Sequence, residues 1–133
     1  MPLQLFDPEE RRDVVDADLP GVVDGDRETV YVIRPIGVDD HRAIVKRNTK
    51  QVIDRASHQK VPMTDYAAVN DDVLDFILVG WRGVLFRGEP VPCERVHKVK
   101  LDPVRRQALS DVAGMNQIAR APEVRAESFR ESA

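Results

Sequence analysis

The chain has few of the residues that mark secreted, membrane-spanning or aromatic-rich proteins. Its one cysteine, Cys93, excludes an internal disulfide, which is consistent with a reducing compartment. Its apolar runs are far shorter than the roughly 20 residues that span a bilayer, and its start carries acids where a signal peptide needs a positive region. Aromatic residues make up 5% of the chain, so the core must be mostly aliphatic. These absences predict a soluble cytosolic protein with no membrane partner.

Motifs of the common enzyme classes are also missing. The chain has no Walker loop, dinucleotide fingerprint, nucleophile elbow or HExxH helix. Cys93 and His97 are four residues apart and would share one face of a helix, but zinc needs three or four protein ligands. His41 and His58 belong to no ligand pair. We therefore expect a protein that is not an enzyme, with no catalytic, cofactor-binding or metal-binding residues.

Charge is divided unevenly along the chain. Residues 1–28 hold nine acids and three arginines, a net charge of −6, whereas the rest holds 14 acids and 17 bases, a net charge of +3. Such an acidic arm is usually solvated and mobile, although it could fold back on the body or mimic a partner. A body with a charge of +3 and mixed signs is too weakly basic to indicate a nucleic-acid partner.

The densest apolar stretch is residues 71–92, DDVLDFILVGWRGVLFRGEPVP. Its first half has apolar residues at offsets of three and four, which predicts one buried face of a helix over 70–82. The aspartates at its start, at 71, 72 and 75, are explained as stabilising the helix N-terminus. Gly83 and Gly88 then turn the chain, and Pro90 prevents the helix from resuming at once. Trp81 has two interpretations, an anchor in the core or an exposed interface residue.

The other elements follow from local patterns. ETVYVIRPI, residues 28–36, is the best strand, and residues 21–25 are expected to pair with it as a hairpin turning at Asp24-Gly25. An amphipathic helix with a basic face is expected over 39–57, and this face meets solvent, an acidic partner or the protein's own acidic arm. Residues 92–100 form either a short helix or an irregular crossing. A last helix over 103–119 starts with Asp102 as N-cap and Pro103 in its first turn.

The length of 133 residues fits one domain. Together these patterns predict a mainly α fold of the α+β type, a small helical domain with a short N-terminal strand or hairpin near 21–35. We expect a flexible acidic arm over 1–20, a single mainly helical domain over 21–121 and a flexible tail over 122–133.

The order of these segments resembles a known family. Over about residues 28–119 the chain is similar to the tail assembly chaperones of long-tailed bacteriophages. The segments that carry the similarity are, in order, YVIRPIG, a charged helix, an apolar segment closing in GWRGV, the tail GEPVPC and the final helix LDPVRRQALSDVAGMNQ. In that family a W-x-G-V ending is followed by a loop of G-x-P-x-P character and a helix. The loop differs from the family pattern in the apolar and basic run Leu85-Phe86-Arg87. The candidate partner-binding or structural residues are Trp81, Gly83, Val84, Phe86, Gly88 and Pro90.

The resemblance implies a non-enzymatic function in the host bacterial cytoplasm. Such chaperones bind the long helical tape-measure protein and help recruit tail tube subunits, and they are absent from the finished virion. The main alternative is a structural virion component, such as a small tail or head-tail adaptor, and a weaker one is a nucleotide- or metal-using enzyme. The sequence leaves self-association and the partner-binding face open.

Overall fold

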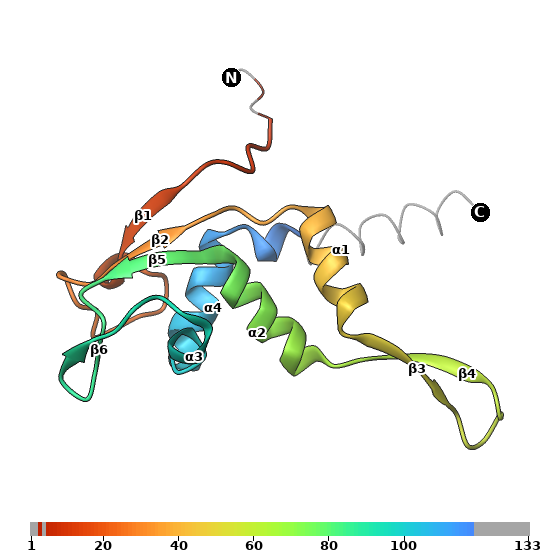
Figure 1. The fold of residues 1–133 in the computed structure, drawn as a ribbon. Coiled ribbons are helices and arrows are strands. Elements are labelled where there is room, and N and C mark those ends of the chain that lie inside the picture. The colour runs from red at the N-terminus through yellow and green to blue at the C-terminus, as the bar shows by residue number, and fades with distance from the viewer. Residues whose placement is uncertain (1–2, 4, 119–133) are drawn as a thin grey trace.

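The structure is a computed structural model that describes residue 3 and residues 5–118 (Figure 1). About 37% of it is helix and 23% strand, and the strands of this part form three small sheets. The fold class is therefore α+β, and the expectation of a mainly α domain was wrong. In chain order the elements are β1 (Arg12–Val15), the 3-10 helix η1 (Asp16–Asp18), β2 (Val30–Ile33), α1 (Val38–Arg47), β3 (Thr49–Ile53), β4 (Lys60–Thr64), α2 (Tyr66–Ile77), β5 (Leu78–Arg82), β6 (Leu85–Phe86), β7 (Glu89–Pro90), α3 (Arg95–Lys98) and α4 (Pro103–Val112).

The largest sheet is antiparallel, with strand order β1-β2-β5. The strand expected over 28–36 is confirmed as β2, but its hairpin partner is β1 and not residues 21–25. Asp24-Gly25 belongs to the long β1–β2 connection, which folds back on η1 through the bond from the Ala17 amide to the Asp26 carbonyl at 3.1 Å. Residues 12–19, assigned to a flexible arm, are part of the fold, and Leu19 is buried.

The helix expected over 39–57 ends ten residues early. Asn48 Nδ2 donates to the Ile44 carbonyl at 2.9 Å, and Thr49 Oγ1 donates to the Val45 carbonyl at 2.7 Å, so side chains satisfy the last carbonyl groups of α1. The β-branched residues that follow then pair as strand β3 with β4. The turn between these strands is built on Asp54, whose carboxylate accepts from the Ser57 hydroxyl at 2.7 Å.

The helix expected over 70–82 begins earlier and ends earlier, as α2. Its N-cap is Asp65, whose side chain accepts from the Ala68 amide at 3.1 Å. It ends at Ile77, where the carbonyl accepts from the Arg34 amide at 2.8 Å, and Leu78 starts β5 with no connecting residue. Trp81 therefore lies on a strand and not on the predicted helix face, because pairing with β2 overrides the local helical period.

The last helix begins as predicted. The Asp102 side chain caps α4 by accepting from the Arg105 amide at 3.1 Å, with Pro103 at the first position. The continuous helix expected over 103–119 is interrupted, because α4 ends at Val112 and Gly114 has a φ of +98°, after which residues 115–118 are helical again. Residue 119 and the expected tail over 122–133 lie outside the described residues. The short-helix alternative for 92–100 is realised as α3.

The core lies where α2 meets the three-stranded sheet, α1 and α4. The side chains of Leu74, Ile77, Leu78 and Leu109 are almost fully enclosed in it. Two hairpins, β3–β4 and β6–β7, project from this body at opposite ends (Figure 1). Within the described residues, none of the helices combines the length and apolarity needed to cross a bilayer.

Candidate functional site

Trp81 fixes the segment that carries most of the candidate residues. It is half-buried, packs against the core and pairs with Tyr31 across the sheet. Its indole Nε1 donates to the Val91 carbonyl at 2.8 Å, and the Val91 amide donates to the Val84 carbonyl at 3.2 Å. These two bonds close the chain between residues 81 and 91 into a loop attached to β5. The core-anchor interpretation of Trp81 therefore describes its position.

Gly83 is required by the geometry at the start of this loop. Its φ is +76°, and a Cβ atom there would lie 2.5 Å from the Glu28 carbonyl oxygen. Its own carbonyl accepts from Thr29 Oγ1 at 2.8 Å, and Thr29 is buried. A side chain at this position would therefore separate β5 from the start of β2.

The β6–β7 hairpin ends in a two-residue turn, Arg87-Gly88. Both residues have positive φ, 53° and 80°, which is the type I′ geometry that matches the twist of the flanking strands. Leu85 pairs with Pro90, and Phe86 with Glu89. Adjacent strand residues point to opposite faces, so Leu85 and Phe86 are presented on different sides of the hairpin.

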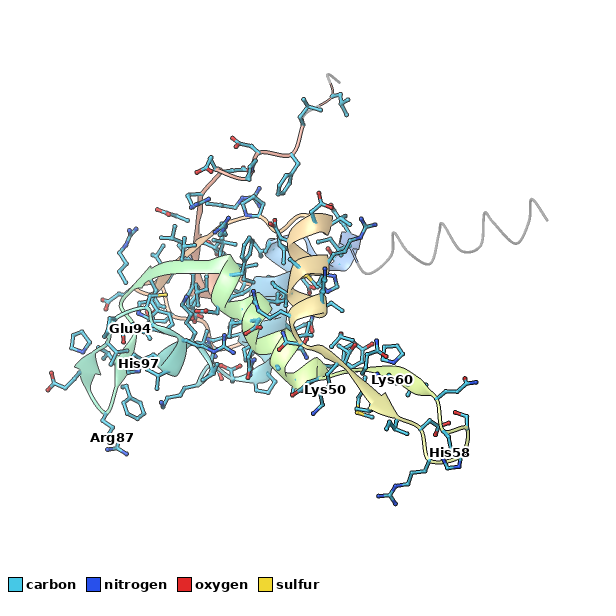
Figure 2. The ribbon with its side chains drawn as sticks, turned by 45° about the vertical axis from the view of Figure 1, so that its right-hand side comes forward. Lys50, His58, Lys60, Arg87, Glu94 and His97 are labelled. Carbon is cyan, nitrogen blue, oxygen red and sulfur yellow. The ribbon has the colours of Figure 1, made fainter. Side chains whose placement is uncertain are left out.

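Phe86 lies among basic groups. The guanidinium carbon of Arg87 is 5.0 Å from the ring centroid, and Lys100 Nζ is 5.2 Å from it. The His97 ring centroid is 6.3 Å away, and Lys100 Nζ also donates to the Val96 carbonyl at 2.9 Å. Figure 2 shows Arg87 at the hairpin tip, with His97 nearer the body. We call this group the Phe86 surface; it comprises Phe86, Arg87, Val96, His97 and Lys100.

This surface presents apolar area together with positive charge. Phe86 and Val96 are exposed to 39% and 55%, and Arg87 and Lys100 are also exposed. Cations over an aromatic face are held by the ring quadrupole, so the two charges remain close to the apolar area. The arrangement suits a ligand that offers both an apolar stripe and carboxylates.

Two aspartates of α2 hold α3, and with it one side of the Phe86 surface. Arg95 Nη1 contacts Asp72 Oδ1 at 2.6 Å, and buried Lys98 donates from Nζ to Asp75 Oδ1 at 2.9 Å. Asp72 also accepts from Asn48 Nδ2 at 2.8 Å and from the Arg47 guanidinium. The hydrogen bonds from Asn48, Arg95 and Arg47 lower the pKa of Asp72 to about 2 despite its burial.

The interpretation of these aspartates as N-terminal helix charges was wrong. The helix begins at Tyr66, so Asp71 and Asp72 lie in its middle and Asp75 in its last turn, and all three make tertiary contacts instead. Asp71 forms an ion pair with Arg106 of α4. These side chains clamp α1, α3 and α4 onto α2, a role that local sequence could not reveal because every partner lies at least 20 residues away.

A second buried network is centred on Asp16, where η1 follows strand β1. Asp16 accepts from Tyr31 Oη at 2.6 Å and from Arg105 Nε at 2.7 Å. Burial raises the pKa of Asp16, but the bonds from Arg105 and Tyr31 outweigh it and bring the pKa down to about 2. Burial, together with the Asp16 carboxylate, raises the pKa of Tyr31. This network joins η1, β2 and α4.

The structure does not assemble a reactive pair from Cys93 and His97. Cys93 precedes α3 and directs its Sγ to the Leu78 carbonyl at 3.8 Å, whereas His97 lies in α3 beside Phe86. Burial raises the pKa of the Cys93 thiol, the opposite of the shift that generates a nucleophilic thiolate. Among the described residues, no three His, Cys, Asp or Glu side chains are grouped as metal ligands would be.

A groove of about 710 Å³ between α2 and α4 is a further surface feature. Val73 and Leu74 line it together with Met115, and the Asp71–Arg106 ion pair links its two helices. Asp71 and Arg106 also line the groove, so charged side chains bound its apolar part.

Sequence reasoning selected Phe86 but missed its neighbours in the structure. Val96 and His97 lie on α3 and Lys100 follows that helix. Trp81 holds the loop that carries Phe86, and the α2 aspartates hold α3. The other candidates, Gly83, Val84, Gly88 and Pro90, form the loop that presents Phe86. No protein-family model, curated protein or solved structure matched the chain.

Proposed function

We propose that the protein is a non-enzymatic tail assembly chaperone of a long-tailed bacteriophage. In this role it binds the tape-measure protein in the host cytoplasm and helps recruit tail tube subunits. The proposal starts from the segments GWRGV and GEPVPC, which resemble that family. The structural observation that supports it is the Phe86 surface, an exposed apolar and basic area mounted on a loop fixed to the core.

The chemistry of this surface fits an amphipathic helix. An elongated helical partner can place apolar side chains on Phe86 and Val96 while its carboxylates meet Arg87 and Lys100. The partner's apolar stripe, otherwise exposed before tail assembly, would be covered by such contacts. The chaperone would act by covering an aggregation-prone helix reversibly.

The test is co-expression with the tape-measure protein of the same phage. Wild-type protein is expected to keep that partner soluble and to co-purify with it. Phe86→Ala is expected to weaken the complex by about 30-fold, the range of an interface hot spot, with little loss of stability because the ring is already part-exposed. Tyr66→Ala is the matched control, since Tyr66 is an exposed aromatic residue, 70% accessible, on a different element.

Purified virions separate the chaperone from the adaptor alternative. A chaperone is absent from mature particles, whereas a small tail or head-tail adaptor is present in stoichiometric amounts. Failure to bind or solubilise the tape-measure protein, together with stoichiometric presence in the virion, would replace the chaperone proposal with the adaptor one.

A further inference from the structure

Residues 42–64, which run from α1 through the β3–β4 hairpin, collect positive charge in one part of the fold. They contain six bases and one acid, a net charge of +5, so the remainder of residues 29–133 carries a net charge of −2. The whole-body charge of +3 therefore conceals this concentration. The one acid, Asp54, is engaged within the turn, where its carboxylate accepts from the Ser57 hydroxyl at 2.7 Å.

Two of the six bases are paired with carboxylates, Arg42 with Asp39 and Arg47 with Asp72. The other four, which are exposed and form no ion pair within the part of the chain that the structure describes, are Lys46, Lys50, Arg55 and Lys60. Figure 2 shows Lys50 and Lys60 along the hairpin and His58 at its tip. Uncompensated positive charge therefore extends from the end of α1 to the turn.

Cross-strand pairing places this charge on both faces of the hairpin. Lys50 pairs with Met63, and Ile53 pairs with Lys60. Positions 50 and 53 are three apart on β3, where side chains alternate between faces, so the two pairs lie on opposite faces. Met63 is 56% exposed and Ile53 is 68% exposed. Each face therefore presents one lysine beside an exposed apolar side chain.

The hairpin is a two-stranded ribbon that projects from the body (Figure 1). Its strands pair over five residues and form a sheet of their own, without a third strand. Its base is held by Thr49 Oγ1, which donates to the Val45 carbonyl at 2.7 Å, and its turn by the Asp54 amide, which donates to the Gln59 carbonyl at 2.9 Å. Both faces of an ordered ribbon are therefore open to a ligand.

A ligand that matches both faces must carry negative charge on two sides. The major groove of B-form DNA is about 12 Å wide, admits a two-stranded β-ribbon and is bordered by phosphates on either side. An acidic helix or protein surface covers one face of the ribbon and leaves the lysine of the other face unmatched. The major groove of an RNA duplex is too narrow for the ribbon. The arrangement therefore fits duplex DNA better than an acidic protein or RNA.

We propose that the β3–β4 hairpin binds duplex DNA by lying in its major groove. Lys50 and Lys60 contact the phosphate backbones on opposite sides of the groove, and Lys46 and Arg55 extend the contact at the base and at the turn. Because these contacts are to phosphates, binding is independent of DNA sequence, and four of them place it in the weak, non-specific class. This inference uses a different surface from the proposed function and does not depend on it.

The test measures the fluorescence anisotropy of a labelled DNA duplex of about 20 base pairs between about 50 and 200 mM NaCl. For wild type, the logarithm of the association constant is expected to fall with the logarithm of salt concentration at a slope of about −3 to −4, since each phosphate contact contributes about −0.9. Lys50→Gln and Lys60→Gln are each expected to weaken binding by about five- to tenfold and to reduce the slope by about one. The double variant is expected to combine the two losses, because the lysines contact different backbones.

Arg87→Gln/Lys100→Gln is the matched control, with two cations removed from the other basic end, and is expected to leave DNA binding unchanged. Lys50→Arg/Lys60→Arg keeps both charges and is expected to bind as wild type does, and circular dichroism checks the fold of each variant. A wild-type protein that does not bind the duplex at about 50 mM NaCl overturns the proposal. A loss confined to one of the two lysine variants also overturns it, because the ligand then contacts a single face. Tighter binding to a polyglutamate peptide, or equal binding to an RNA duplex, overturns it in favour of an acidic protein or a contact outside the groove.

Discussion

Replacing Trp81 tests how the candidate loop is held. Trp81→Phe keeps an aromatic ring against the core but removes the indole N–H that donates to the Val91 carbonyl at 2.8 Å. Losing one partner of a part-buried bond costs about 1 kcal/mol, which lowers the melting temperature of a domain of this size by about 4 °C. Trp81→Ala also removes the half-buried ring, and its cost rises to about 3 kcal/mol, the low end for a core aromatic.

The two Trp81 variants are measured by urea unfolding and by amide hydrogen exchange. In Trp81→Phe the Val91 amide, bonded to Val84, is expected to exchange faster while amides of β2 keep their protection. Trp81→Ala is expected to lose stability and partner binding together, as loss of a core anchor requires. Tyr66→Phe, which alters an exposed aromatic, serves as control. Wild-type stability and unchanged Val91 exchange in Trp81→Phe would refute the argument that the indole bond closes the loop.

Three further predictions follow from other parts of the structure. Gly83→Ala is expected to lower the free energy of unfolding in urea by about 2 kcal/mol or more, because the added Cβ would meet backbone atoms. Gly88→Ala, with open space around it, is expected to cost only about 1 kcal/mol of backbone strain. Equal costs for the two variants would contradict this argument. Asp16 and Asp72 have pKa values lowered from 3.8 to about 2. Each therefore contributes roughly 1–2 kcal/mol to the free energy of unfolding above pH 4, and this contribution is lost as the pH falls toward 2. Unfolding free energies that match at pH 6 and pH 2.5 would count against the two networks. Cys93→Ser is expected to leave the fold and partner binding intact, and loss of either in thermal melts or co-purification would assign the thiol a role.

Local signals predicted the elements that depend on neighbouring residues alone. Asp102 and Pro103 mark the start of α4 because a cap and a fixed φ act within one turn. Similarly, β-branched residues identified β2. The type I′ turn at Arg87-Gly88 was found only in part, since Gly88 indicates a turn but not a hairpin.

Pairing between strands distant in sequence determined the secondary structure of the segments that local patterns predicted wrongly. Phe76, Ile77, Gly80 and Trp81 recur at helical offsets, but residues 78–82 form strand β5 because β2 supplies hydrogen-bond partners there. The same effect turned the second half of the basic helix into β3, whose partner β4 follows a turn. Of the candidate site, the sequence identified the loop and Phe86, but not Val96 and His97 of α3 or Lys100, two residues after that helix.

The direct junction of α2 and β5 limits where this chain can change its length. Ile77 ends the helix and Leu78 begins the strand, so an extra residue between them would rotate the helix face by about 100° or shift the strand register by one, turning Trp81 to the opposite side of the sheet. The turn between β3 and β4 has no such constraint, because its residues 55–58 are exposed and contribute nothing to the core. Related chains are therefore expected to carry insertions in that turn, while the spacing from Asp72 to Trp81 stays constant.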